Sequence, residues 1–308
     1  MAAVGGATRT AAFTALAAVA PISWGTTYLV TTEFLPPDRP LLSGVLRTLP
    51  AGLAVLLLTR RLPRGRWWWR SAVLGLLNIG AFNALLFVAA YRLPGGVAAT
   101  LTSMQPLLVA GLAAVLLGER PTTWRLGWGV AGVAGVALMV LRGDASFDLL
   151  GVVAGVAAAA SMATGIVLIK RWGQPNGAGL LSFTGWQLAA GGLLVVPLAV
   201  IVEGPPPALD AAAVGGYAWL GIVCTLVAYL LWFQGVGRLP VSAVTFLALL
   251  SPMVATALGW LVLGQPLTAL QTVGFIVAMV SILGAQLTPQ AARALLTTTP
   301  RTGHSATR

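Results

Sequence analysis

Residues 92–121, RLPGGVAATLTSMQPLLVAGLAAVLLGERP, recur in altered form at residues 238–266 as RLPVSAVTFLALLSPMVATALGWLVLGQP. With each residue number raised by 146, the identical positions are Arg92-Leu93-Pro94, Leu101, Pro106, Leu112 and Leu117-Gly118. Leu and Ala match by chance between apolar segments, but a repeated Arg-Leu-Pro and an in-register proline do so rarely. The sequence therefore predicts an internal duplication.

Both copies belong to a chain with very few charges. Of its 308 residues, 18 are Lys or Arg and 7 are Asp or Glu, while 58% are hydrophobic and the mean hydropathy is +0.90. Charged residues make up 8%, against about 25% in ordinary globular proteins. A soluble fold of this length would lack the polar residues to cover its surface. The chain is therefore predicted to be an all-α integral membrane protein.

Ten apolar segments have about the 20 residues that a helix needs to cross a bilayer. They are 12–30, 41–59, 71–90, 95–117, 124–141, 149–169, 180–202, 213–235, 241–263 and 268–288. Five fall in a first repeat, residues 12–141, and five in a second repeat, residues 149–288, followed by a disordered cytoplasmic tail at 289–308. Because five is odd, the second repeat enters the membrane from the opposite side. The predicted fold is two inverted five-helix repeats around a central cavity.

The basic residues predict the orientation of the chain. With the N-terminus inside, 14 basic residues and one acidic residue lie on the cytoplasmic side, against three basic and six acidic residues outside. This is the positive-inside asymmetry of multi-pass membrane proteins. We expect a protein of the bacterial cytoplasmic (inner) membrane with both termini in the cytoplasm. The same asymmetry explains the net charge of +11, so nucleic-acid binding is not expected.

Residue usage argues against metal, cofactor and enzyme chemistry. Cys224 is the single cysteine, and the single histidine, His304, falls in the polar tail. No metal site or cofactor is therefore expected. The spans contain no acidic residue, no Ser–His or Ser–Lys pair and no Gly-x-Ser-x-Gly motif, which disfavours a membrane-embedded enzyme. The lack of a membrane carboxylate also disfavours acid-based proton antiport and favours facilitated diffusion or exchange.

Several motifs resemble the EamA repeat of the drug/metabolite transporter superfamily. They are Trp24-Gly25, Arg47, the Leu-x4-Pro-x11-Gly-Glu-x-Pro pattern from Leu101 to Pro121, YLLWF at 229–233, and Ser251-Pro252. The resemblance covers about residues 12–288 and implies a ten-helix carrier with two inverted repeats. Gln265 of the second repeat replaces Glu119 of the first, so any role of that acid is not duplicated.

A narrower resemblance is to the exporters of the blue pigment indigoidine within this superfamily. The strings that carry it are ISWGTTY at 22–28, TTEFLPPDRP at 31–40, NIG at 78–80, FVAAYRLPGG at 87–96 and TGWQL at 184–188. The resemblance implies export of a pigment or another small metabolite.

Arg47 is the one ionisable residue well inside a predicted span. A guanidinium in a bilayer is costly unless it is paired or hydrated, so Arg47 is a candidate for substrate binding. A structural clamp onto backbone carbonyls is the alternative. The other candidates are polar or aromatic residues at membrane depth: Trp24, Thr27, Tyr28, Asn78, Asn83, Tyr91, Ser103, Gln105, Ser161, Thr164, Trp186, Gln187, Thr225, Tyr229, Trp232 and Ser251.

Two prolines at matching places in the repeats, Pro106 and Pro252, are candidate helix breaks that face the substrate. As a set, the candidates predict a pocket with uncharged hydrogen-bonding groups and aromatic walls. Such a pocket suits a flat solute that is neutral or zwitterionic.

The predicted function is a secondary transporter of the inner membrane that exports small metabolites by alternating access. An indigoidine-like pigment or an amino-acid-like solute is expected. An importer of the same fold and a non-transporting membrane regulator or scaffold are the alternatives. The expected partners are the lipid bilayer and a small-molecule substrate. A small-residue face at Gly151-x-x-x-Gly155 predicts a helix contact within the chain or in a homodimer.

Overall fold

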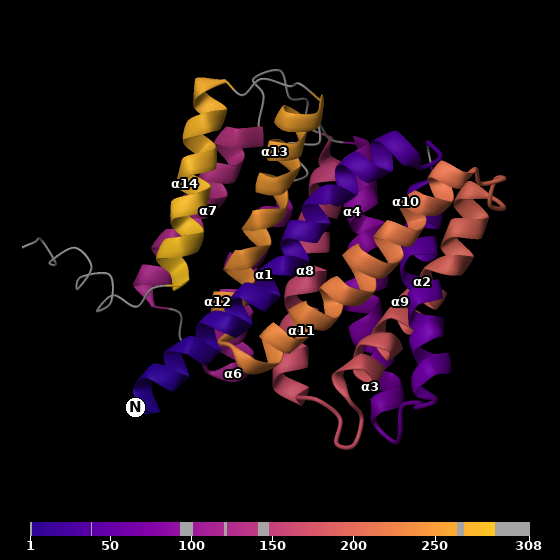
Figure 1. Cartoon of the computed structure of the whole chain (residues 1–308), viewed down its shortest axis with the longest axis horizontal. Helices are drawn as coiled ribbons and strands as arrows, with labels where there is room; N and C mark the ends of the chain where they lie inside the picture. The colour runs from indigo at the N-terminus through magenta and orange to yellow at the C-terminus, as the bar shows by residue number, and fades with distance from the viewer. Residues whose placement is uncertain are drawn as a thin grey trace, which may run out of the picture.

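The computed structural model describes residues 2–37, 39–92, 101–119, 122–140, 148–263 and 268–286, and the regular structure within these ranges is helical (Figure 1). The helices of the first half are α1 (Ala2–Phe34), α2 (Pro40–Thr59), α3 (Trp67–Gly75), η1 (Leu76–Gly80), α4 (Ala81–Arg92), α6 (Gln105–Leu117) and α7 (Thr123–Val140). Those of the second half are α8 (Leu149–Trp172), α9 (Leu180–Glu203), α10 (Ala211–Gly221), η2 (Ile222–Val227), α11 (Ala228–Arg238), α12 (Val241–Phe246), η3 (Leu247–Leu249), α13 (Leu250–Leu263) and α14 (Ala269–Gln286).

The helical stretches of the described ranges follow the ten predicted segments. Seven have the length and hydropathy of a membrane span, and Leu101–Leu117 and Ala269–Ala285 are apolar but shorter. The chain is thus an all-helical membrane protein. The first helix is longer than the predicted 12–30, while residues 95–100 and the predicted tail lie outside the described ranges.

Local sequence explains where several helices begin and end. Asp148 caps α8 by accepting the backbone N–H of Gly151 at 2.8 Å, and Asp210 caps α10 by accepting that of Ala213 at 2.7 Å. Gly118 ends α6 with a φ of 70°, a left-handed conformation that glycine adopts without strain.

Glycines let two pairs of helices approach closely, one helix of each pair coming from each half. A Cβ at Gly52 of α2 would lie 2.7 Å from the Cα of Ala189 on α9. A Cβ at Gly135 of α7 would lie 2.7 Å from the backbone nitrogen of Ala278 on α14. In a bilayer such small-residue contacts drive helix association, because lipid provides no hydrophobic force between helices.

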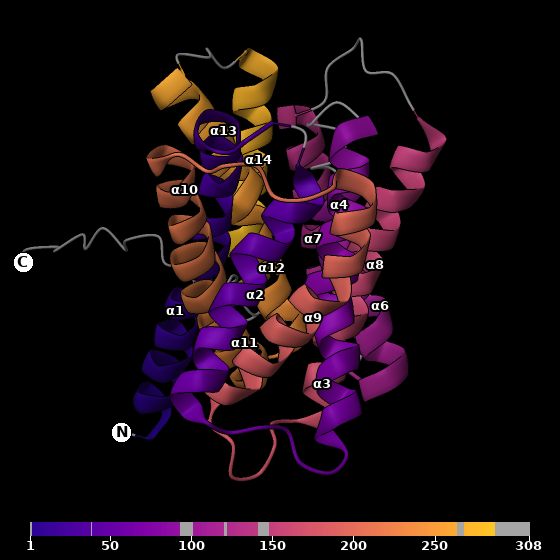
Figure 2. The ribbon, with the colours of Figure 1, turned by 90° about the vertical axis from the view of Figure 1, so that its right-hand side faces the viewer.

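The remaining helices pack crosswise between the halves (Figures 1 and 2). Helix α1 lies against α11 and α13, and α8 lies against α4 and α6. Helix α8 is the counterpart of α1 in the other half, and α4 and α6 are the counterparts of α11 and α13. The two sets of contacts are therefore equivalent. Gly155 of α8 contributes to this packing, because a Cβ there would lie 2.8 Å from Leu101 Cδ1. The predicted Gly151-x-x-x-Gly155 face therefore makes a contact within the chain.

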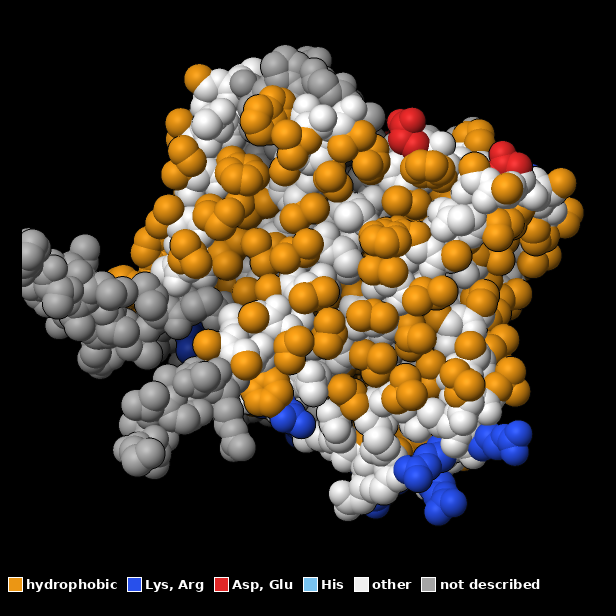
Figure 3. Space-filling view, viewed as in Figure 1, with side chains coloured by type: hydrophobic (Ala, Val, Ile, Leu, Met, Phe, Trp, Pro, Cys, Tyr) orange, Lys and Arg blue, Asp and Glu red, His pale blue; other side chains and the backbone are white. Residues whose placement is uncertain are grey.

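Exposed apolar side chains cover the face of the bundle shown in Figure 3, and charged side chains gather at its two ends. Val115, Ile201 and Leu58 are among the most exposed apolar residues. Lys and Arg side chains lie at the lower end of the view, and Asp and Glu side chains lie at the upper end. A surface of this kind suits a bilayer, with lipid tails around the middle and water at each end.

Candidate substrate-binding site

Arg47 of α2 is buried between the two halves, with 8% of its surface exposed. Its Nε donates to the hydroxyl of Thr225 at 3.2 Å, and its Nη2 donates to the carbonyl oxygen of Cys224 at 3.5 Å. Both partners are neutral and belong to η2. Arg47 therefore connects the second helix of the first half to the third helical stretch of the second half.

The carbonyl of Cys224 is available to Arg47 because η2 is π-helical. In an α-helix the N–H of Ala228 would donate to Cys224, but here it donates to the carbonyls of Val223 and Thr225. The bypassed oxygen accepts the indole N–H of Trp24, on α1, at 2.8 Å as well as the longer bond from Arg47. The π-helical turn thus creates an acceptor that two side chains of the other half share.

The first half contains a related π-helical turn at the equivalent place. The N–H of Ala81 donates to Leu76 and bypasses the carbonyl of Leu77, which accepts the hydroxyl of Ser161 on α8 at 2.9 Å. The first residue of η1 is Leu76 and that of η2 is Ile222, which the repeat offset of 146 residues makes equivalent. Each π-helical turn is therefore bonded to the first helix of the opposite half.

Aromatic rings line this junction. The ring of Trp24 packs 5.4 Å from Tyr229 and 5.2 Å from Trp232, both measured between ring centroids. Tyr229 and Trp232 are buried, whereas Trp24 is partly exposed. The Nε1 of Trp232 and the hydroxyl of Thr27 are buried with no hydrogen-bond partner among the described residues.

Two amides continue the polar network toward the middle of the bundle. The side-chain amide of Asn78, in η1, donates to Gln187 Oε1 on α9 at 3.1 Å, and the Tyr229 hydroxyl donates to the backbone carbonyl of Asn78 at 3.4 Å. Both amide residues are fully buried, and the Oδ1 of Asn78 has no partner within the described part of the chain. Buried polar atoms normally find a partner, so an unpaired one marks a place that water or a ligand can occupy.

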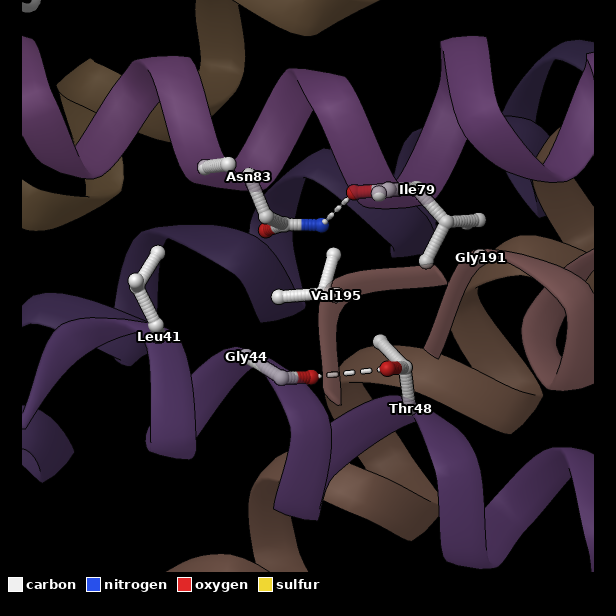
Figure 4. Close-up of a pocket in the computed structure, with 9 residues that line it drawn as sticks. Leu41, Gly44, Thr48, Ile79, Asn83, Gly191 and Val195 are labelled. Carbon is white, nitrogen blue, oxygen red and sulfur yellow. Dashed lines mark hydrogen bonds between the residues drawn. The ribbon is translucent and has the colours of Figure 1, made fainter. Parts of the chain in front are cut away.

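A small pocket lies between α2, η1, α4 and α9 (Figure 4). Thr48 and Asn83 line it together with apolar residues and glycines, and it has room for little more than one water molecule. The amide of Asn83 donates to the Ile79 carbonyl at 2.6 Å, and the Thr48 hydroxyl donates to the Gly44 carbonyl at 2.7 Å.

The structure brings together about half of the predicted site residues. Those of the junction are Trp24, Thr27, Arg47, Asn78, Asn83, Ser161, Gln187, Thr225, Tyr229 and Trp232. Trp186 lies elsewhere, since its Nε1 donates to the carbonyl of Arg61 at 2.7 Å at the basic end of the bundle. Thr164 bonds to Ala160 within its own helix.

The predicted helix breaks and the residues beside them lie in α6, α13 and the turns that precede them. Ser103 and Gln105 are buried, and Pro106 is the second residue of α6 after a turn at Met104. Ser251 and Pro252 are the second and third residues of α13, which directly follows the 3-10 turn η3. The side chains of Tyr28 and Tyr91 lie outside the described part.

Sequence reasoning missed the carbonyls of Cys224 and Leu77 as site groups. A backbone acceptor carries no residue-type signal, and only the helix geometry makes it available. Sequence reasoning also missed Thr184, whose buried hydroxyl lies one turn before Gln187 and has no partner among the described residues.

Comparison with known proteins agrees with the family expected from the motifs. Residues 12–141 and 149–286 each match the EamA-like transporter family. Protein PecM of Dickeya dadantii is 45% identical over 257 residues, which are 83% of this chain and 86% of that protein. The uncharacterized inner membrane transporter YedA of Escherichia coli K12 is 31% identical over 283 residues, covering 87% and 90%. One crystal structure, 20% identical, superposes with a TM-score of 0.76 over 92% of this chain and 99% of that chain, which shows the same fold.

Proposed function

Because the chain belongs to the EamA-like transporter family, we propose that it is a secondary transporter that exports small metabolites from the cytoplasm by alternating access. The family is one of transporters rather than enzymes. The direction, the solute and the alternating mechanism are what the proposal adds.

The observation that carries this proposal is that the two halves make equivalent contacts with each other. Contacts of α1 with α11 and α13 are mirrored by contacts of α8 with α4 and α6, and the π-helical turns η1 and η2 occupy equivalent positions. This supports two inverted repeats, residues 12–141 and 149–288. Two similar halves with opposite directions give inward-facing and outward-facing states of similar energy, which a carrier requires.

We place the solute at the junction of the halves, among Arg47, Trp24, Tyr229, Asn78 and Gln187. In the structure these side chains fill the junction with polar and aromatic groups, so the proposed central cavity opens when the halves separate. The hydrogen bonds at the bypassed carbonyls are side-chain bonds to backbone, which can exchange for bonds to a solute. The pigment-exporter strings support an indigoidine-like or amino-acid-like solute.

The proposed location is the cytoplasmic membrane with both termini inside. The support is the segregation of charge, with Lys and Arg side chains at one end and Asp and Glu side chains at the other (Figure 3). YedA, named an inner membrane transporter, is similar over most of its length. A homodimer remains a prediction from the sequence.

Proteoliposomes test the proposal directly. Vesicles that contain the purified chain are loaded with indigoidine or with aromatic amino acids, and solute release is followed against protein-free vesicles. Saturable release of at least one solute supports the transporter. Release equal to that of protein-free vesicles for every solute favours the non-transporting scaffold. Vesicles in which the chain has one known orientation distinguish export from import, when transport of a solute supplied inside is compared with transport of the same solute supplied outside.

A further inference from the structure

Arg47 is a buried cation with spare hydrogen-bonding capacity. A guanidinium offers five N–H donors, and the structure gives Arg47 two bonds, to the Thr225 hydroxyl and the Cys224 carbonyl. The second, at 3.5 Å, is at the outer limit of hydrogen-bond length. Neutral groups therefore hold the side chain in place but use only part of its hydrogen-bonding capacity.

Within the described ranges, no acidic side chain is paired with Arg47. Among the described residues the ion pair is that of Arg92 with Asp148, and it lies at a helix end with both side chains exposed. Glu203 and Asp210 likewise lie at helix ends, where they bond to the backbone N–H groups that begin α2 and α10. The junction between the halves thus carries a net positive charge in a medium of low dielectric constant, which attracts anions and repels cations.

An aromatic surface adjoins the guanidinium. Trp24 Nε1 and Arg47 Nη2 donate to the same oxygen, that of Cys224, so the indole and the guanidinium lie side by side. The hydroxyl of Thr27, one helical turn after Trp24, is buried without a partner among the described groups. An anionic group on Arg47 would therefore bring an attached ring alongside Trp24.

We infer that the site takes a flat aromatic solute that carries a carboxylate or a similar anionic oxygen group, with that group on Arg47. A carboxylate can accept two parallel N–H bonds from one guanidinium, which neither the Thr225 hydroxyl nor a single carbonyl provides. This inference rests on the proposed function and names the chemical class of its solute. The carboxylate of a zwitterion satisfies it, whereas a solute whose ring carries only a cation does not.

Three probes with the same ring and different charge test the inference: benzoate, benzamide and benzylammonium. Their binding to the full-length chain in lipid nanodiscs is measured by thermal shift at constant ionic strength, with chloride as the reference anion. We expect benzoate to bind at least tenfold more tightly than benzamide, and benzylammonium not to bind. Arg47→Gln should abolish the preference for benzoate. The matched control Arg92→Gln, which removes an exposed arginine at a helix end, should keep the preference.

Several outcomes of the binding experiment overturn the inference. One such outcome is that benzamide or benzylammonium binds as tightly as benzoate. The others are an unchanged benzoate response in Arg47→Gln and no response to any probe. Each of them would favour the interpretation of Arg47 as a structural clamp. Should Arg47→Gln fail to fold, the charge preference of the natural chain and a weaker benzoate response in Arg47→Lys decide the question. Benzoate binding with no transport in proteoliposomes would refute the carrier but not the site. Saturable transport with no preference for anions would refute the site but not the carrier.

Discussion

The indole nitrogen of Trp24 donates to the carbonyl oxygen of Cys224 at 2.8 Å, across 200 positions of sequence. The bond joins the first helix of one half to the π-helical turn of the other. The oxygen is within reach because the N–H of Ala228, which would bond to it in an α-helix, bonds to the carbonyls of Val223 and Thr225 instead. A local irregularity of the backbone thereby becomes a link between the two halves.

Removing the donor from this link should cost stability. Trp24→Phe keeps an aromatic ring, smaller than the indole, and deletes the N–H, so the long bond from Arg47 is the side-chain bond that the Cys224 carbonyl oxygen retains. We expect a loss of about 0.5–1.5 kcal/mol in the free energy of unfolding, the usual net contribution of one hydrogen bond. Chemical denaturation in detergent measures it. Trp68→Phe, at an exposed indole, is the control and should change little, and equal losses in the two variants would contradict this account.

The contact between α2 and α9 should not tolerate a methyl group at Gly52. Its Cβ would meet the backbone of Ala189, which cannot move aside as a side chain can. We expect Gly52→Ala to destabilise the protein by about 1–3 kcal/mol, as overpacking does. Gly111→Ala is a matched control, since a Cβ there meets nothing within 4 Å. Alanine at Gly111 should be neutral or stabilise by up to about 1 kcal/mol through helix propensity, and a loss there as large as at Gly52 would refute the steric explanation.

The cap of α8 should make stability depend on pH. The backbone N–H of Gly151, and then the guanidinium of Arg92, hold the pKa of Asp148 below its usual value of 3.8. A lowered pKa means that the carboxylate stabilises the folded chain above pH 3.8 and that this contribution is lost as the pH falls through the lowered value. The Tm difference between the natural chain and Asp148→Asn should therefore be constant from pH 7 to about 5 and shrink below about 4.

The roles of the two groups that lower the Asp148 pKa can be separated. Because the Gly151 N–H is the larger cause, Arg92→Gln should keep most of the pH dependence. A pH dependence that disappears in Arg92→Gln but persists in Asp148→Asn would contradict this assignment.

The proposed orientation predicts which loops face the cytoplasm. Cys224 is the only cysteine of the chain and is fully buried, so single cysteines added elsewhere can be labelled against a low background. In intact bacteria a membrane-impermeant maleimide should label Pro206→Cys, and it should label Arg64→Cys only after the membrane is permeabilised. The reverse pattern would place the N-terminus outside.

Hydropathy and charge were enough to predict the helices and their order. A lipid-facing helix must satisfy its own backbone, so each apolar run of about 20 residues has one available structure. The helix termini depended on local residues such as Asp148 and Gly118, and their positions shifted by a few residues from those expected. The repeat could also be predicted, because Arg92-Leu93-Pro94 and the in-register Pro106 recur 146 residues later in the sequence.

The candidate site was only partly predictable. Arg47 stood out because a charge in a span is rare, and its neighbours Trp24 and Tyr229 followed from their depth. The π-helical turns were not foreseen, because a change of backbone hydrogen bonding has no residue-type signal, and the side chains that bond to the bypassed carbonyls, such as Ser161, come from distant helices. Trp186 was grouped with the site by depth, yet its indole reaches the carbonyl of Arg61 near the helix end. Depth along a helix does not determine which side of it a residue occupies.

The close pairing of α2 with α9 has a consequence for biogenesis. During synthesis α2 enters the bilayer more than a hundred residues before α9 leaves the ribosome, so the surface around Gly52 that α9 later covers is first exposed to lipid. Until α9 is inserted, the first half cannot form its close contact between α2 and α9. A truncated gene that encodes one half would leave this surface permanently in contact with acyl chains, or would force two copies of the fragment to pack on each other.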